Sequence, residues 1–372
     1  MKYVKNLDGI RGLAIVLVMF FHYDYLIEMG WMGVQLFFVL SGYLITTILL
    51  QDKQEQSLGL YMKGFYWRRT LRIFPIYYLY IFFVAGVYAA FHTPEDFRET
   101  APFLFTYTYN LFPLVYDFRF DTFFTHFWSL SIEEQFYLFW PLIVYFLTLR
   151  QLRVVLVGMI LVAPVIRFLL ASYLLEKGVS ADFTGQIVYR FTFGQWDTFA
   201  FGAAIPVFGL LSAPINPAKW LWGAGFLAVA LGLLNYAAMV NGGSGVGISS
   251  LGYPCGGMEN YQYVWSYTLI ALLCMCIILA VVKYEQGKVV RVLFGNAFMV
   301  FLGKISYGLY VYHWIIWMAF GKFAKPYFKI PLLGFICYGL ICIGVAYISF
   351  VVVEKPLLSF KNKFFNRNQV AT

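Results

Sequence analysis

Charged residues are scarce in this sequence of 372 residues. Asp, Glu, Lys and Arg together make up 12% of it, whereas a soluble domain carries about 25%. Hydrophobic residues make up 61%, and the mean hydropathy is +0.72. These values exclude an ordinary soluble domain and predict a multi-pass integral membrane protein.

Cysteine and histidine are also few. Four of the five cysteines, all except Cys255, lie in apolar runs, where they would pack as small hydrophobic residues. The four histidines lie on separate segments without the spacing of metal ligands: His22, His92, His126 and His313. We therefore expect neither a disulfide framework nor a metal site.

Apolar runs close to 20 residues long recur along the chain, and a helix of that length spans a bilayer. The runs are 9–27, 32–50, 73–91, 128–149, 153–173, 191–211, 219–239, 264–283, 295–320 and 331–353. They predict an all-α integral membrane protein with about ten transmembrane helices around a central polar cavity. Residues 1–354 are expected to form this transmembrane domain and residues 355–372 a short cytoplasmic tail. The first run is too long and too charged for a cleaved signal peptide.

The distribution of basic residues predicts the orientation. With both termini inside, the cytoplasmic loops hold seventeen Lys and Arg residues and the external loops hold seven. We therefore expect both termini to be cytoplasmic and the protein to lie in the cell (inner, cytoplasmic) membrane. The net charge of +9 is explained by this bias and by attraction to anionic lipid, so nucleic acid is not an expected partner.

Two external loops are long enough to act as lids or recognition surfaces, 92–127 and 239–263. The first contains the residues of a predicted acceptor surface, which are Tyr107, Tyr109, Tyr116, Asp117 and Asp121. The second is rich in glycine and is either a lid or a disordered connector.

Three polar side chains share one face of the first apolar run. At about 100° per residue, Asp8, Arg11 and His22 fall within an arc of roughly 60°. Ionisable groups in hydrocarbon cost several kcal/mol, so this face is a candidate functional site. His22 lies about 16 Å along the helix from Arg11 and could act as a general base, while Asp8 could orient Arg11. A histidine alone would be read as a hydrogen-bonded residue in a packed interface.

His22 is accompanied by a series of motifs. They are LDGIRGLA at 7–14, GVQLFFVLSGYLI at 33–45, FWSLSIEEQFY at 127–137, GKISYGLYVYHW at 303–314 and EKP at 354–356. In this order they resemble the acyltransferase-3 family of integral membrane acyltransferases. The resemblance implies transfer of an acyl group, commonly acetyl, from acyl-coenzyme A to a hydroxyl of a saccharide or related molecule. It also implies that His22 is the essential histidine, Arg11 its partner, and Arg69 and Arg72 an arginine pair.

Basic residues cluster before the third apolar run, at Lys63, Arg68, Arg69 and Arg72. Cytoplasmic coenzyme A would arrive on this side, and guanidinium groups bind phosphates through two parallel hydrogen bonds. We expect this cluster to bind the donor, with Arg69 and Arg72 the principal residues. Setting the topology and contacting lipid phosphate is the alternative explanation.

The fourth run presents a polar stripe of Ser129, Glu133 and Tyr137, spaced four residues apart. Glu133 could orient the imidazole or position the acceptor hydroxyl. Its neighbour Glu134 is a weaker candidate, because Ser131 and Glu134 have the spacing of a helix capping box.

A second stripe, Ser306, Tyr310 and His313 in the ninth run, is expected to face the same cavity. Arg167 and Asp197 are the remaining intramembrane charges, and a structural ion pair between them is predicted.

The sequence thus predicts a membrane O-acyltransferase with acetyl-coenzyme A as a co-substrate and no permanently bound cofactor. Its acceptor would be a saccharide, a lipid-linked glycan or a small-molecule hydroxyl. The alternative is a proton-coupled secondary transporter that relays protons through His22, Glu133 and Asp197. A transporter does not require the arginine cluster, and the chain lacks evident inverted halves.

Overall fold

The computed structural model describes residues 3–91, 94–116 and 123–359, with the backbone alone at 91 and 94–96. Within these ranges all regular structure is helical. The α-helices are α1 (Lys5–His22), α2 (Met32–Glu55), α3 (Leu58–Phe91), α4 (Pro94–Phe105), α5 (Phe112–Val115), α6 (Trp128–Phe146), α7 (Leu149–Glu176), α8 (Ala181–Arg190), α9 (Trp196–Val207), α10 (Pro217–Asn241), α11 (Gln262–Lys283), α12 (Lys288–Leu293), α13 (Ala297–Lys304), α14 (Ser306–Phe323) and α15 (Pro331–Ser349). Shorter turns include η1 (Glu28–Trp31), η3 (Thr125–Phe127), η4 (Thr192–Gln195) and a π-helical turn, η8 (Phe350–Glu354).

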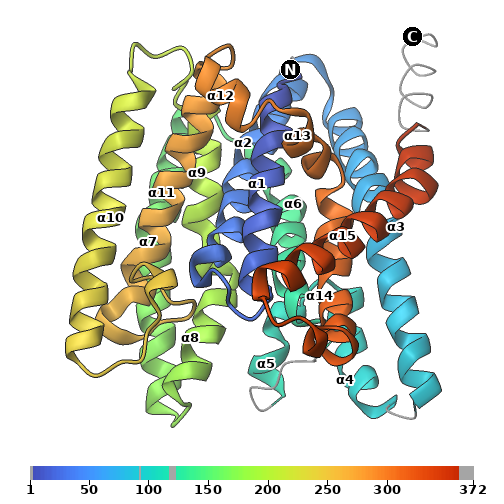
Figure 1. The fold of residues 1–372 in the computed structure, drawn as a ribbon. Coiled ribbons are helices and arrows are strands. Elements are labelled where there is room, and N and C mark those ends of the chain that lie inside the picture. Colours follow the sequence, from blue (N-terminus) through green and yellow to red (C-terminus); the bar gives the residue numbers. More distant parts are fainter. Residues whose placement is uncertain (1–2, 92–93, 117–122, 360–372) are drawn as a thin grey trace.

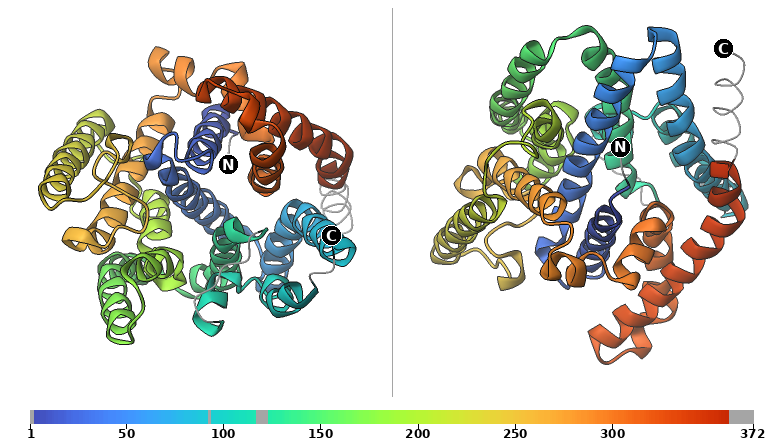
Figure 2. Two further views of the ribbon diagram at one scale, coloured as in Figure 1. Left: turned by 60° about the horizontal axis from the view of Figure 1, so that its bottom comes forward. Right: turned by 90° about the horizontal axis from the view of Figure 1, so that it is seen from above.

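Helices α1 and α2 form the centre of the bundle, and the other helices enclose them (Figure 2). Helix α1 packs against α13 and α2, while α2 packs against α9. The approach of α13 to α1 depends on Gly303, because a Cβ atom there would lie 1.7 Å from the backbone oxygen of Asp8. This close contact fixes the first turns of α1, which carry Asp8 and Arg11.

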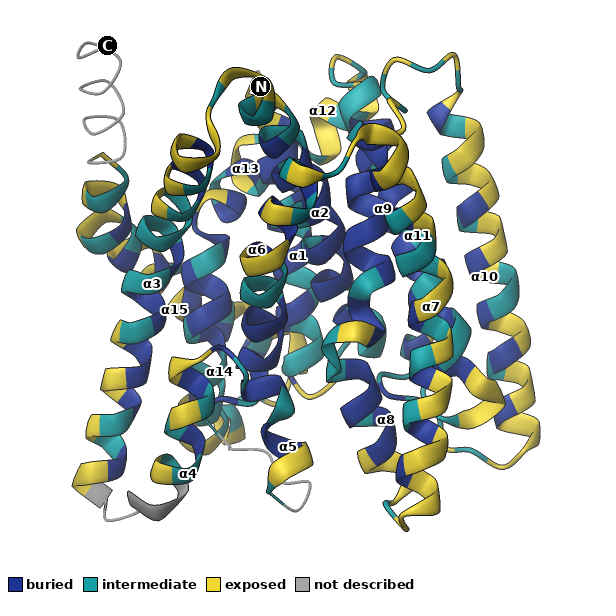
Figure 3. Ribbon diagram, turned by 180° about the vertical axis from the view of Figure 1, so that it is seen from behind, coloured by how far each residue is buried: buried dark blue, intermediate teal, exposed yellow. Residues whose placement is uncertain are grey.

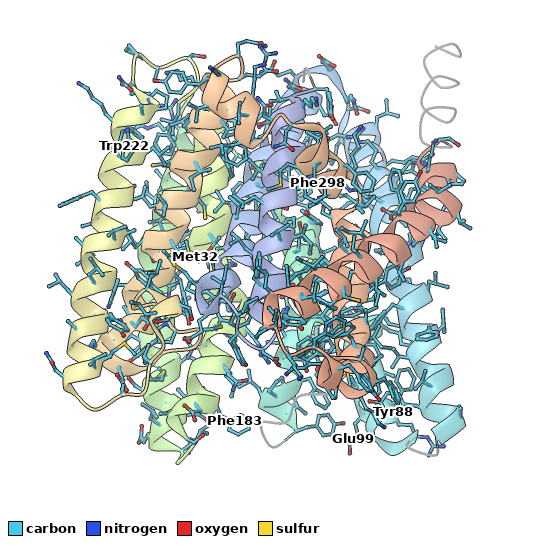
Figure 4. The ribbon with its side chains drawn as sticks, viewed as in Figure 1. Met32, Tyr88, Glu99, Phe183, Trp222 and Phe298 are labelled. Carbon is cyan, nitrogen blue, oxygen red and sulfur yellow. The ribbon has the colours of Figure 1, made fainter. Side chains whose placement is uncertain are left out.

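Long apolar helices cover the outside of the bundle. Six helical segments of the described chain are long and apolar enough to cross a membrane, and they begin at Glu28, Leu58, Leu149, Pro217, Glu259 and Pro331. Four of these segments, which contain α3, α7, α10 and α15, have exposed apolar outward faces, whereas the segments that contain α2 and α11 are mostly buried, as is α1 (Figure 3). Trp222 on α10 is 78% exposed and projects from the edge of the bundle (Figure 4). The expectation of an all-α, multi-pass membrane protein is therefore supported.

The remaining four expected spans differ from single long apolar helices. Helix α1 holds three charged residues in its first two turns, and the 19-residue α6 contains Glu133, Glu134 and Gln135. The run 191–211 contains the 12-residue α9 preceded by η4, and the run 295–320 is divided at Ile305 between α13 and α14. The figure of about ten spans therefore stays a prediction.

The two ends of the bundle differ in the loops they hold. The start of α1 lies at the same end as α12 and α13, and α4, α5 and α8 lie at the opposite end (Figure 1). The charge bias predicts that the segments at these two ends lie on opposite sides of the membrane, and their arrangement agrees with this. The cytoplasmic position of the termini stays a prediction. Most of the expected tail, 360–372, lies outside the described residues.

Candidate active site

A cavity lined by three arginines and two glutamates lies between α1, α2, α3, α6 and α14. We call it the arginine cavity. Counted with its opening to solvent, the space between its walls is about 820 Å³. Its polar lining residues are Arg11, Ser41, Arg69, Arg72, Ser129, Glu133, Glu134, Tyr137, Ser306, Tyr307 and Tyr310. Nine of the predicted site residues are therefore brought together here from four helices, α1, α3, α6 and α14.

The arginines reach the cavity from two helices. Arg11 is paired with Asp8 at 3.2 Å, which confirms the predicted pair on α1. Arg69 and Arg72 lie one turn apart within α3, and the Arg69 guanidinium lies 4.7 Å from the centre of the Tyr137 ring. Three cations at one cavity favour an anionic ligand.

The other two predicted donor-binding residues lie outside the cavity lining. Arg68 points to a different side of α3 and is paired with Asp52 at 2.5 Å. Lys63 is exposed and lies nearer the start of the same helix. Because successive residues on a helix face different directions, the run of basic residues is divided between the cavity and the surface.

Glu133 is hydrogen bonded within the arginine cavity. Its carboxylate accepts hydrogen bonds from the Ser41 and Tyr137 hydroxyls. The hydrogen-bond partners of Glu133 are therefore hydroxyl groups, whereas His22 is hydrogen bonded to His313. Ser41, which the sequence analysis quoted only inside a motif, is an additional cavity residue.

The capping-box interpretation of Glu134 is wrong. Helix α6 begins at Trp128, so Ser131 lies inside the helix, and its hydroxyl donates to the Phe127 carbonyl at 3.2 Å. Glu134 instead lines the arginine cavity, and its Oε1 atom has no hydrogen-bond partner among the described residues. Glu134 is thus a second carboxylate, besides Glu133, in a cavity that is also lined by three arginines.

A second cavity, the histidine cavity, lies beyond the carboxyl-terminal end of α1. It measures about 1330 Å³ with its opening. Its lining residues include Tyr25, Glu28, Trp31, Trp128, Gln186, Tyr189, Arg190, Cys255 and Trp314, together with His22 and His126. Five of these are Tyr or Trp side chains, and Glu28, Gln186, Arg190, His22 and His126 carry polar or charged groups suited to a polar ligand.

A hydrogen-bond chain fixes the imidazole of His22. The Nδ1 atom of His313 lies 2.6 Å from the Tyr310 carbonyl, and its Nε2 atom lies 2.9 Å from Nδ1 of His22. A carbonyl only accepts, so neutral His313 carries its proton on Nδ1 and its Nε2 accepts from His22. Neutral His22 is thereby protonated on Nδ1, which leaves Nε2 as the atom able to take up a proton.

The two cavities share a wall, where the sequence predicted one central cavity. Val34 and Tyr310 line both, and the Tyr310 hydroxyl donates to the His126 carbonyl at 2.9 Å. Tyr310 also shares a hydrogen bond with the Ser129 hydroxyl. His22 and the three arginines Arg11, Arg69 and Arg72 therefore line different cavities, which meet at Val34 and Tyr310.

Two site residues were not singled out from the sequence. His126 lines the histidine cavity and lies 3.0 Å from the Val311 carbonyl through Nε2. Glu354 is only 7% exposed, and its Oε1 atom would lie 3.5 Å from a Cβ atom at Gly308. Its carboxylate interacts electrostatically with Arg72. The sequence signal that could have identified Glu354 is its position as an acidic residue directly after the apolar run 331–353.

The ion pair of Arg167 and Asp197 is confirmed at 3.0 Å, and both side chains are fully buried. Arg167 also donates to the Gly194 carbonyl at 2.6 Å and to the Thr268 hydroxyl at 2.6 Å. Neither residue lines the two cavities. The pair joins α7, α9 and α11, so its role is structural, as predicted.

The two long loops, predicted to be external, differ from the expected acceptor surface. Tyr107 and Tyr109 are buried, and the Tyr107 ring stacks on Tyr77 with 4.3 Å between ring centres. Asp117 and Asp121 lie outside the described residues. The glycine-rich loop is described throughout, and its Ser249 hydroxyl donates to Glu28 at 3.1 Å. This loop therefore contributes to the wall of the histidine cavity instead of forming a loose connector.

The described residues hold no group of three His, Cys, Asp or Glu side chains that could bind a metal ion. All five cysteines are free. Cys255 in the external loop lines the histidine cavity, and burial raises the pKa of its thiol to about 12. At neutral pH this thiol is protonated, so Cys255 is a poor candidate for a nucleophile.

Two known proteins that are similar to this chain carry the name O-acetyltransferase. A protein named "Putative O-acetyltransferase SACOL0978" from Staphylococcus aureus is 26% identical over 371 residues, which cover 96% of this chain and 57% of that protein. The peptidoglycan O-acetyltransferase OatA of Listeria monocytogenes is 41% identical over 150 residues, 38% of this chain and 24% of OatA. The matches thus cover 57% of the first relative and 24% of the second, and no solved structure matches the chain. The family model described as "Acyltransferase domain" matches residues 4–351, and the chain therefore belongs to the acyltransferase-3 family.

Proposed function

We propose that this protein is a membrane O-acetyltransferase that moves an acetyl group from cytoplasmic acetyl-coenzyme A to a hydroxyl of a cell-envelope saccharide. Membership of the acyltransferase family supports the reaction class. The names of two relatives, an O-acetyltransferase and a peptidoglycan O-acetyltransferase, support the acetyl group and the glycan acceptor.

The arginine cavity is the proposed donor site. Arg11, Arg69 and Arg72 would bind phosphates of coenzyme A, because guanidinium groups match phosphate oxygens in geometry and charge. The pantetheine arm would extend along α1 toward the wall between the cavities. Arg11 and His22 are eleven residues apart, about 16 Å along the helix, which is within reach of such an arm.

The histidine cavity is the proposed acceptor site. Aromatic side chains such as Trp128, Tyr189 and Trp314 offer apolar faces against which sugar rings can pack. Glu28 and Gln186 offer hydrogen-bond partners for further hydroxyls. A saccharide bound here would present one hydroxyl to His22.

The reaction then follows from the protonation of the histidine pair. The Nε2 atom of His22 takes the proton of the acceptor hydroxyl while its oxygen attacks the thioester carbonyl carbon. The carbon–sulfur bond breaks, the thiolate of coenzyme A takes the proton back from His22, and the ester is released. His313 accepts the Nδ1–H of His22 throughout, which keeps the ring oriented. This hydrogen-bond chain is the observation that carries the proposal.

The test uses purified protein in lipid nanodiscs with acetyl-coenzyme A and a peptidoglycan fragment as acceptor. We expect free thiol and acetylated glycan to form in equal amounts, and His22→Ala to reduce both by about 100-fold or more. Cys337→Ala, in α15 and outside the linings of both cavities, serves as the control and should retain activity. Equal transfer by the wild type and His22→Ala would contradict the proposed base.

A further inference from the structure

The two cavities meet where they share lining residues. Of the described residues, Val34 on α2 and Tyr310 on α14 line both cavities, and each is 6% exposed. These two side chains therefore mark the boundary at which the arginine cavity meets the histidine cavity.

Tyr310 is held in place at this boundary by three contacts. Its hydroxyl donates to the His126 carbonyl at 2.9 Å and also contacts the Ser129 hydroxyl. The ring of Phe37 packs edge-on against it, with 6.4 Å between ring centres and 76° between planes. Movement of the Tyr310 ring would break these contacts, so the space at this boundary depends on Val34, the other residue that lines both cavities.

We propose that Val34 limits the length of the acyl group that the protein transfers, so that acetyl is accepted and longer chains are rejected. The inference rests on the proposed function. A thioester whose coenzyme A lies in the arginine cavity must place its carbonyl at the boundary between the cavities, beside Val34 and Tyr310, to meet a hydroxyl beside His22. Its acyl tail then lies against Val34 and the Tyr310 ring.

The energetics of such a site favour discrimination by size. A single methylene group in an apolar pocket changes specificity by roughly 10-fold to 200-fold. Removing two methyl groups from Val34 leaves room for about one or two carbon atoms of a longer acyl chain. Adding one methylene group reduces that room.

The experiment compares kcat/KM for acetyl-, propionyl- and butyryl-coenzyme A with one fixed glycan acceptor. Val34→Ala should raise the propionyl-to-acetyl ratio about 10-fold, and Val34→Ile should lower it. Val39→Ala is the matched control, because Val39 is a fully buried valine of the same helix that lines neither cavity. Its ratio should equal that of the wild type.

Two results would overturn the inference, and they differ in what else they affect. Chain-length ratios that stay at the wild-type value in both Val34 variants, while acetyl transfer continues, would overturn the role of Val34 and leave the proposed function intact. Absence of transfer by the wild type from all three donors would overturn the proposed function and this inference with it. Because the two variants act in opposite directions, a folding defect in Val34→Ala still leaves Val34→Ile to decide.

Discussion

At the scale of single residues, the site depends on side chains that fix one another. The sequence placed Asp8, Arg11 and His22 on one helix face, and the structure confirms the Asp8–Arg11 pair. The sequence did not predict the contact between His313 and His22. The two residues lie 291 positions apart, and the apolar pattern of a span does not specify which helix it contacts. Periodicity gives the face of a helix, and packing decides its partner.

His313 is expected to act as a positioning residue. Replacing it with leucine removes the acceptor for the Nδ1–H of His22, so the imidazole loses its fixed tautomer, and kcat should fall about 100-fold with an unchanged KM for the glycan. His313→Gln, whose amide oxygen can accept the same hydrogen bond, should restore part of the activity. Equal loss in both variants would show that the hydrogen bond is not the important feature.

Glu354 is expected to hold Arg72 in the donor site. Its buried carboxylate interacts with Arg72, so Glu354→Gln should raise the KM for acetyl-coenzyme A by about 5-fold to 10-fold, and less in an Arg72→Gln background. The measurement is a double-mutant cycle on donor KM, repeated with acetyl-pantetheine, which lacks the phosphates of the nucleotide end. An equal effect of Glu354→Gln on both donors would contradict the link through Arg72.

At the scale of elements, the apolar runs predicted most of the helices and missed their interruptions. Helix α1 ends at His22, and Asp24 and Tyr25 then adopt positive φ angles of 50° and 55°. The run 9–27 contains no glycine or proline at this break, so nothing in its composition indicated it. The division of 295–320 into α13 and α14 was likewise hidden, because both parts are apolar.

The contact between α1 and α13 leads to a prediction about stability. A Cβ atom at Gly303 would lie 1.7 Å from a backbone oxygen of α1, so Gly303→Ala should separate the helices and lower the melting temperature measurably. Overpacking of this kind costs roughly 1–3 kcal/mol or more. The control is Gly158→Ala in α7, where nothing lies within 4 Å of the added atom. Equal thermal unfolding of the two variants in detergent would contradict the packing argument.

At the scale of the whole molecule, the structure divides one expected cavity into two chambers along α1. Composition and charge bias predicted the membrane class and an orientation, but the partition arises from Val34 and Tyr310 on helices far apart in sequence. Only their packing in three dimensions reveals it. The division suits a reaction whose donor is cytoplasmic and whose acceptor lies on the other side.

The orientation can be tested with introduced cysteines. Lys288→Cys at the α12 end should react with an impermeant maleimide only in opened cells, and Gly245→Cys in the glycine-rich loop should react in intact cells. The native Cys255 thiol should contribute little, because its pKa of about 12 keeps it protonated at neutral pH. The opposite pattern of labelling would reverse the predicted topology.

The central claim is that a donor in the arginine cavity and an acceptor in the histidine cavity meet at the wall they share. It is tested most directly in proteoliposomes of one orientation, with the α12 end facing outward, labelled acetyl-coenzyme A outside and the glycan acceptor enclosed. We predict that acetylated glycan accumulates inside and that Arg72→Gln and His22→Ala each reduce it. Acetylation that occurs only when donor and acceptor are supplied on the same side would contradict the account.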